Sequence, residues 1–304
     1  MRKIIVIAGP TAVGKTEYAI RVAEKFNGEI VSCDSMQLYK YMDIGSAKPT
    51  PEEQKRAKHY LIDEIDPRED FSVAVYQKMA KKYIEDIFNK GKTPVIAGGT
   101  GLYLNSLVYD MDFAGGSQDS EIRDRYYKMA EEEGKEKVHQ ILMEKAPDIG
   151  RRIHPNNLKK VIRALETVET EGESIKDFAS LNARCKDYEC MMICLNRDRE
   201  ELYDRINRRV DMLVDMGLLD EVKSLMDMGF TSDNIAMKGI GYKEIIDYFN
   251  GEYDLDTALE LVKRNTRRYA KRQITWFKRY EDMKWFNLSE DSLEDILQWI
   301  EKNM

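Results

Sequence analysis

The sequence has few residues of the kinds that bind transition metals or form disulfides. It contains four cysteines and three histidines among 304 residues. No two cysteines form a C-x-x-C pair, and no group of Cys, His and carboxylate residues has the spacing of a zinc site. Two of the cysteines lie in the apolar run Cys190–Leu195, which is typical of a buried strand. We therefore expect buried thiols rather than disulfides or metal ligands.

Long hydrophobic runs, internal repeats and low-complexity segments are also missing. The first apolar run, Ile4–Ile7, is far too short to cross a membrane and does not form a signal peptide. Hydrophobic residues make up 42% of the chain, which is sufficient for a packed core, and 304 residues suggest about two domains. We expect a globular, monomeric protein of the cytoplasm that does not bind membranes.

Positive charge is outnumbered overall but concentrated locally. The formal net charge of −7 argues against a protein that coats nucleic acid over its whole surface. Segment 263–280 nevertheless contains eight Lys and Arg residues and no acidic residue. On a helix, Arg264, Arg268 and Arg272 share one face, and a polyphosphate strand against that face would relieve their repulsion. The alternative is a solvated face; a second basic cluster, at 151–163, would let the chain grip RNA from two sides.

The most specific motif is a P-loop, G-x-x-x-x-G-K-[ST]. A β-branched run precedes it and a helix-like segment, Glu17–Phe26, follows it. This order directs backbone N–H groups and a helix N-terminus at a chain of phosphates, while the lysine adds charge and the last hydroxyl can hold Mg²⁺. The residues concerned are Gly9, Pro10, Thr11, Ala12, Val13, Gly14, Lys15 and Thr16, with Thr16 as the metal ligand.

Two further strand ends carry chemistry next to this loop. The run Glu29–Ser32 leads to Asp34, and the run Pro94–Ala97 leads to two glycines and Thr100. In open α/β sheets, ligands bind at the carboxyl ends of the strands, so these residues belong beside the phosphate site. At that position Asp34 can act as a general base or as an indirect magnesium ligand. The alternative is an aspartate that is solvated in a loop or caps a helix.

Strands and helices alternate up to about residue 112, after which the pattern becomes purely helical. Segment 115–120 breaks the pattern, and three helices are predicted after it: one from Asp119 or Ser120 to Glu133, then Lys135–Lys145 and Pro155–Thr170. Met191–Leu195 returns as a core strand, and everything after Arg199 reads as helix. We therefore predict an α/β fold: a P-loop nucleoside-triphosphate-hydrolase-like core with a parallel sheet (1–112 and 187–304) and an all-helical insertion domain (113–186).

Several blocks taken together resemble the successive motifs of the tRNA dimethylallyltransferases, and they cover nearly the whole chain. Members of this family transfer the dimethylallyl group of dimethylallyl diphosphate to N6 of the adenosine 3′ of the tRNA anticodon, position 37, so that their P-loop holds the leaving diphosphate. The resemblance is to the bacterial form, without the C-terminal zinc module of eukaryotic relatives. The matching blocks are Gly9–Thr16, Asp34–Pro49, Gly98–Tyr103, His154–Asn156, Arg163–Glu166, Gly239–Tyr242 and Lys271–Trp276.

The resemblance implies roles for individual residues. Asp34 takes the N6 proton, Thr100 contacts the reacting end of the site, and Arg209 joins Lys15 and Mg²⁺ in neutralising the leaving diphosphate. The insertion domain and the basic helix hold the anticodon stem-loop. Arg268 is added to these contacts because it lies on the basic face. The expected tRNA contacts are then Asp34, Ser35, Met36, Gln37, Thr100, Arg123, Lys159, Lys160, Arg163, Lys238, Gly239, Ile240, Gly241, Tyr242, Lys243, Arg268, Lys271, Arg272, Gln273, Trp276 and Lys278.

Two other functions share parts of this pattern. A small-molecule or nucleotide kinase has the same P-loop, a strand-end acid and the same fold class, but lacks the insertion and the basic helix. A regulatory GTPase or RNA-binding ATPase is less consistent with the sequence, because no Asn-Lys-x-Asp guanine motif is present and no apolar strand ends in a Walker-B acid.

Overall fold

The computed structural model describes residues 1–69, 71–109, 111, 120–171 and 183–304. Its contacts divide the chain into two compact units, which we call the core unit (residues 1–108 and 185–304) and the helical unit (residues 109–184). The sequence placed these divisions at 112/113 and 186/187; the first of them, and Asp119 as a helix cap, lie outside the described residues.

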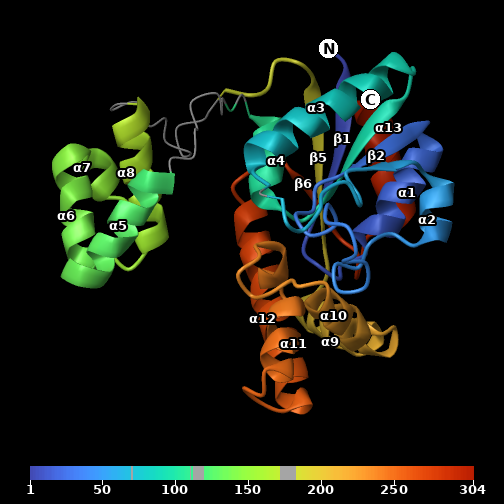
Figure 1. Ribbon diagram of the computed structural model, residues 1–304. Helices are drawn as coiled ribbons and strands as arrows, with labels where there is room; N and C mark the ends of the chain where they lie inside the picture. The colour runs from blue at the N-terminus through green and yellow to red at the C-terminus, as the bar shows by residue number, and fades with distance from the viewer. Residues whose placement is uncertain (70, 110, 112–119, 172–182) are drawn as a thin grey trace. The chain divides into compact units, whose positions relative to one another are not determined.

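The described part of the core unit contains a six-stranded sheet in the order β3-β2-β4-β1-β5-β6, with parallel neighbours throughout (Figure 1). The central strand β1 aligns Ile5 with Val95 of β4 on one side and with Met191 of β5 on the other. The predicted parallel α/β fold is thus confirmed. The strands are β1 (Lys3–Ala8), β2 (Gly28–Ser32), β3 (His59–Tyr60), β4 (Thr93–Gly98), β5 (Glu189–Asn196) and β6 (Lys284–Asn287).

Helices cover the sheet because its strands are apolar on both faces. Ile5 and Ile7 of β1 share one buried cluster with Ile20 of α1 and Ile300 of α13. Helix α3 packs on β2, β4 and α4 (Figure 1). Two-sided burial of this kind is expected for parallel sheets. The helices concerned are α1 (Lys15–Lys25), α2 (Pro51–Arg56), α3 (Val73–Asn89), α4 (Gly101–Val108) and α13 (Leu293–Asn303).

A second group of helices lies beyond the carboxyl ends of the strands, below the sheet in Figure 1. Helix α12 packs against α9, α11 and α4, so it connects this group with the sheet. The group brings segments from the last third of the chain to the edge where β1, β2 and β4 end. Its members are α9 (Arg199–Asp215), α10 (Leu218–Asp227), η1 (Ala236–Lys238), α11 (Tyr242–Phe249) and α12 (Leu255–Phe277).

The helical unit has its own apolar core, formed by residues such as Tyr126, Val138, Leu142, Val161 and Leu165. Three of its helices match the predicted ones within a few residues, and a short fourth helix separates the second from the third. The helices are α5 (Ser120–Glu133), α6 (Lys135–Lys145), α7 (Pro147–Gly150) and α8 (Leu158–Glu171).

The prediction that everything after Arg199 is helical is wrong at β6. This strand has only four residues, of which Phe286 is buried, and it forms because it pairs in register with β5, for instance Phe286 with Leu195. A strand that depends on a partner so distant in sequence leaves no periodic signal of its own. All four cysteines are free, and no helix within the described ranges is long and apolar enough to span a bilayer.

Candidate active site

The P-loop, Gly9–Thr16, connects β1 with α1. Gly14 has φ 113°, a conformation that favours glycine, and the helix begins at the next residue, Lys15. The Lys15 ammonium donates to Pro10 O at 2.8 Å. Burial lowers the pKa of Lys15 to about 8, against an opposing contribution from Asp34. The loop therefore holds a poorly solvated cation where an anion would stabilise its charged form.

Arginines from the second half of the core unit support this loop. Arg197 Nε donates to Val13 O at 3.1 Å, and Arg205 Nε donates to Ala12 O at 2.9 Å. Arg209 lies one helical turn after Arg205, and burial lowers its pKa while Asp34 opposes the shift. The sequence argument identified only Arg209, since single arginines on a helix give no sign that they reach a loop nearly two hundred residues away.

A cavity of about 250 Å³ brings the predicted chemistry together. Its wall contains Lys15, Thr16, Asp34 and Arg209, all of which the sequence assigned to the reacting site. The side chain of Tyr269, which the sequence argument did not select, also lines it, and burial raises the pKa of this phenol above its usual range. The other lining residues include Thr11, Ala12, Gly14, Ser32, Gln37, Ser46, Pro49, Glu53, His59, Gly98 and Gln273.

Asp34 and Thr100 occupy adjoining loops at this edge of the sheet. Asp34 Oδ1 accepts from Met36 N at 2.9 Å, which fixes the carboxylate in a tight turn. The Thr100 hydroxyl accepts from Ser35 N at 3.0 Å and donates to Ser35 Oγ at 3.3 Å. Thr100 N in turn donates to Cys33 O at 3.1 Å. The loop after β4 thereby holds the loop after β2, including Asp34.

The segment after Asp34 is also fastened to helices α10 and α11. The Glu221 carboxylate accepts from Asp43 N, Ile44 N and Gly45 N at 2.7–3.0 Å, and from the Tyr242 hydroxyl at 2.8 Å. Tyr242 is fully buried, so its side chain serves this packing. A Cβ on Gly239 would lie 2.4 Å from Met36 Cε, which shows that two of the segments predicted to contact tRNA adjoin.

The rest of segment 238–243 is divided between surface and interior. Lys238 and Lys243 are exposed, whereas Gly241 is buried and its N–H donates to Glu244 Oε2 at 2.9 Å. Ile240 is half-buried. Only the two lysines extend their side chains freely into solvent, and contact between this segment and tRNA stays a prediction.

Two other residues predicted to contact tRNA, Gln273 and Trp276, point inward from α12. Gln273 is 5% exposed, and its amide bonds to the P-loop and to Gly99. The Trp276 ring lies against Gly101, where a Cβ would come within 2.3–2.6 Å of ring atoms. The indole N–H of Trp276 is buried, without a hydrogen-bond partner in the described chain. The sequence placed Trp276 among the expected tRNA contacts; in the structure its ring packs against Gly101 of α4.

The outer face of α12 has the predicted positive charge. Arg264, Arg268, Lys271 and Arg272 are exposed, and none forms a salt bridge with a described carboxylate. Lys263, by contrast, is paired with Asp211 of α9 at 2.8 Å. The cationic face thus begins at Arg264 rather than at Lys263. Beyond the end of the helix Lys278 is exposed as well.

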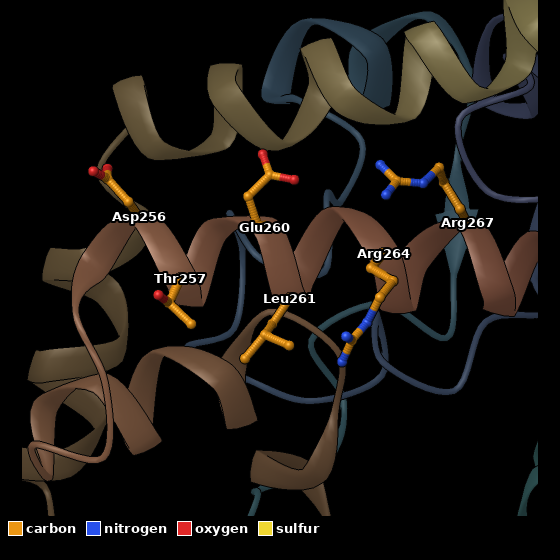
Figure 2. A pocket seen from close by; sticks show the side chains of 6 residues that line it. All are labelled: Asp256, Thr257, Glu260, Leu261, Arg264 and Arg267. Atoms are coloured by element: carbon orange, nitrogen blue, oxygen red, sulfur yellow. The ribbon is translucent and has the colours of Figure 1, made fainter.

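A more open hollow of about 440 Å³ lies along the first half of α12 (Figure 2). Asp256, Glu260 and Arg267 point to one side of the helix in this view, and Leu261 and Arg264 to the other. Arg267 Nη1 donates to Asn207 of α9. The residues that line this hollow have mixed charge, and none belongs to the P-loop or to a strand end. We therefore interpret the hollow as part of the helix packing rather than as a reacting site.

The helical unit has the remaining predicted residues. Arg123 Nε donates to the buried Glu166 carboxylate at 2.7 Å, so this arginine is already neutralised within the unit. Lys159, Lys160 and Arg163 are exposed on α8. They are available to a polyanion, whereas Arg123 would have to exchange its partner.

Thr16 and two carboxylates of the same cavity form a donor set that suits Mg²⁺. Magnesium is usually held by one or two carboxylates or hydroxyls together with substrate phosphates and water. Thr16, Asp34 and Glu53 all line the cavity. No cluster of three or more His, Cys, Asp or Glu that could hold a metal occurs in the described residues. The residues therefore fit an ion that is bound jointly with a phosphate ligand.

Comparisons with known proteins identify the family to which the chain is similar. Residues 37–280 match the model of the IPP transferase family. The chain is 52% identical over 304 residues to a tRNA dimethylallyltransferase of Alkaliphilus oremlandii, covering 99% of this chain and 97% of that protein. It is 53% identical over 298 residues to a tRNA dimethylallyltransferase of Clostridioides difficile, covering 97% of this chain and 95% of that protein.

Two solved structures are similar over nearly the whole chain. The full-length tRNA isopentenylpyrophosphate transferase of Bacillus halodurans has a TM-score of 0.75 at 40% identity, with 99% of this chain and 96% of that one covered. A eukaryotic dimethylallyltransferase acting on tRNA has a TM-score of 0.82 at 29% identity, with 98% and 76% covered.

Proposed function

The chain belongs to the tRNA dimethylallyltransferase family, the IPP transferases, and from that premise we propose how its residues perform the transfer. As a transferase that modifies tRNA, it moves the dimethylallyl group from its diphosphate to N6 of adenosine 37, next to the anticodon, and releases diphosphate. We propose that it acts in the cytoplasm as a monomer. The observation that supports the reaction is that Lys15, Thr16, Asp34 and Arg209 line one cavity.

The leaving group binds at the P-loop. Backbone N–H groups at the start of α1, together with Lys15 and Arg209, neutralise the diphosphate as the bond between its oxygen and C1 of the dimethylallyl group breaks. Both cations are poorly solvated, so each gains from pairing with an anion. Mg²⁺ held by Thr16 and the phosphates would supply further charge neutralisation.

The acceptor is activated at the adjoining loop. The N6 amine is a weak nucleophile because its lone pair is delocalised into the adenine ring. As N6 bonds to C1, the Asp34 carboxylate takes the N6 proton, and the hydroxyl of Thr100 holds the loop on which Asp34 lies. The base reaches this position by leaving the stack of the anticodon loop, which costs little in single-stranded RNA.

A direct assay tests this proposal. The purified protein is incubated with unmodified tRNA, dimethylallyl diphosphate and Mg²⁺, and nucleosides are analysed by mass spectrometry. We expect N6-dimethylallyladenosine at one position per tRNA and an equal amount of diphosphate. Parallel incubation with γ-labelled ATP and candidate acceptors tests the kinase alternative. Transfer of labelled phosphate, without prenylated adenosine, would contradict the proposed reaction.

A further inference from the structure

The side chain of Gln273 joins two loops that hold opposite halves of the site. Its Oε1 accepts from Thr11 N in the P-loop at 2.8 Å, and its Nε2 donates to Gly99 O in the loop after β4 at 2.9 Å. Gln273 is 262 residues from Thr11 and 174 from Gly99 in sequence, so nothing local in the chain supplies this link. The two loops follow the paired strands β1 and β4 and lie close together, since a Cβ on Gly99 would also come within 3.4 Å of Gly9 O.

The two loops do different work in the proposed reaction. The P-loop holds the leaving diphosphate, while Gly99 directly precedes Thr100, whose hydroxyl holds Ser35 N beside Asp34. One loop therefore fixes the carbon that is attacked, and the other fixes the proton acceptor. A change in their spacing therefore alters the distance between the attacked carbon and the Asp34 carboxylate.

The fit around this amide is tight. A Cβ on Gly99 would lie 2.2 Å from Gln273 Nε2, so glycine is required there for the amide to reach the backbone. The side chain accepts a hydrogen bond at one end and donates one at the other. The amide of Gln does both without a charge, because its oxygen accepts and its NH₂ group donates. Arg272, the preceding residue, is exposed on the same helix, so neighbouring positions of α12 face solvent and the site.

We propose that Gln273 is a positioning residue of the transfer step, which sets the spacing between the diphosphate loop and the loop that carries Thr100. This inference rests on the proposed function and replaces the sequence-based expectation that Gln273 contacts tRNA. Misplacement of reacting groups by about 1 Å lowers turnover by about 10²-fold. The effect of removing the amide therefore falls on kcat rather than on the KM for tRNA.

The first test is Gln273→Met, which keeps the length of the side chain and removes both hydrogen bonds. We expect kcat to fall about 10²-fold while the KM for tRNA changes less than about twofold. The matched control is Gln298→Met on α13, where the exposed amide donates to Glu294 of the same helix and to no other described residue. This control is expected to keep the wild-type kcat. Thermal unfolding of all three proteins is measured alongside.

The second test is Gln273→Glu, whose effect depends on protonation. A neutral carboxyl can accept from Thr11 N and donate to Gly99 O as the amide does, whereas a carboxylate faces Gly99 O without a proton. Burial raises the pKa of a carboxyl, so the neutral form becomes populated in the accessible pH range. We expect the ratio of the variant kcat to the wild-type kcat to rise at least about tenfold from pH 8.5 to 5.5. Taking the ratio removes any pH dependence that the variant and the wild type have in common.

The outcomes are distinguishable. A wild-type protein that does not prenylate tRNA would refute the proposed function before Gln273 is tested. With an active wild type, a raised tRNA KM at unchanged kcat in Gln273→Met would assign the residue to RNA binding and overturn the inference. An unchanged kcat, or a Gln273→Glu ratio that stays flat with pH, would overturn it too. If Gln273→Met does not fold, the pH dependence of Gln273→Glu decides.

Discussion

When the prenyl donor, dimethylallyl diphosphate, binds, we expect the protein to take up a proton at Lys15. Burial in the P-loop lowers the pKa of this ammonium from its usual 10.5 to about 8, so at pH 8 about half of the free protein has an uncharged Lys15. A bound diphosphate favours the charged form and raises the pKa again. The number of protons taken up from solvent per donor molecule bound is therefore about 0.1 at pH 7, about 0.5 at pH 8 and about 0.9 at pH 9.

The same linkage fixes the direction of the affinity change. Because the free protein must first acquire the proton, donor affinity falls as the pH rises above the pKa of free Lys15. Between pH 7.5 and 9 the expected loss is about eightfold, which is the ratio of the charged fractions of free Lys15 at the two pH values. The neighbouring thiols do not interfere, since burial raises the pKa of Cys33 to about 12 and that of Cys194 above its usual range.

Calorimetry measures this uptake directly. Titration of the protein with dimethylallyl diphosphate in buffers of different ionisation enthalpy gives the number of protons bound at each pH. Lys15→Arg is the control, because a guanidinium stays charged over this range and should abolish the uptake even if affinity drops. An uptake that is absent at pH 8 in the wild type, or equal in Lys15→Arg, would refute the assignment of the proton to Lys15.

Three other changes have defined outcomes. Asp34→Asn should lower kcat by about 10²–10⁴ with donor affinity unchanged in calorimetry, and near-normal turnover would exclude Asp34 as the proton acceptor. Replacing Arg268 and Arg272 together by Ala should reduce the slope of log K for tRNA against log [salt] by roughly one unit per lost phosphate contact, whereas lines of equal slope for the variant and the wild type would favour a solvated face. Glu221→Ala removes an acceptor shared by three backbone N–H groups and Tyr242, so the free energy of unfolding should drop by about 2–3 kcal/mol in denaturant titrations, and a drop below about 0.5 kcal/mol would show that this carboxylate does not hold the loop.

The sequence predicted the features of the fold and the site that local residue patterns determine. The β-branched run before Gly9 and the glycines of the motif specify a strand, a turn and a helix start within about fifteen residues, and the structure has them as β1, the P-loop and α1. The position of Asp34 near the loop followed from the rule that parallel strands end at one edge. Both inferences need only sequence neighbours and the parallel order of the strands.

What could not be predicted depends on contacts between distant segments. Arg205 of α9 and Arg197, which precedes this helix, donate to P-loop carbonyls. In the sequence neither can be distinguished from an ordinary surface arginine. Gln273 stands in a run of cations that reads as RNA-binding, yet it lies on the inner side of α12. Composition shows how many cations a helix has, but the direction of each side chain is decided by what the helix packs against.

The combination of an acidic chain with a cationic helix face has a physical consequence for tRNA binding. At physiological ionic strength the Debye length is about 8 Å, so charges farther than this from a phosphate contribute little. The net charge of −7 is therefore felt weakly by an RNA that already lies on α12, where Arg264, Arg268, Lys271 and Arg272 have no described acidic partner. At low salt the acidic remainder of the surface repels tRNA over a longer range and restricts productive approach to this face. The proposed tRNA-binding face would thus let an acidic protein bind tRNA without coating nucleic acid, and this face is the outer side of the helix whose inner side reaches the P-loop through Gln273.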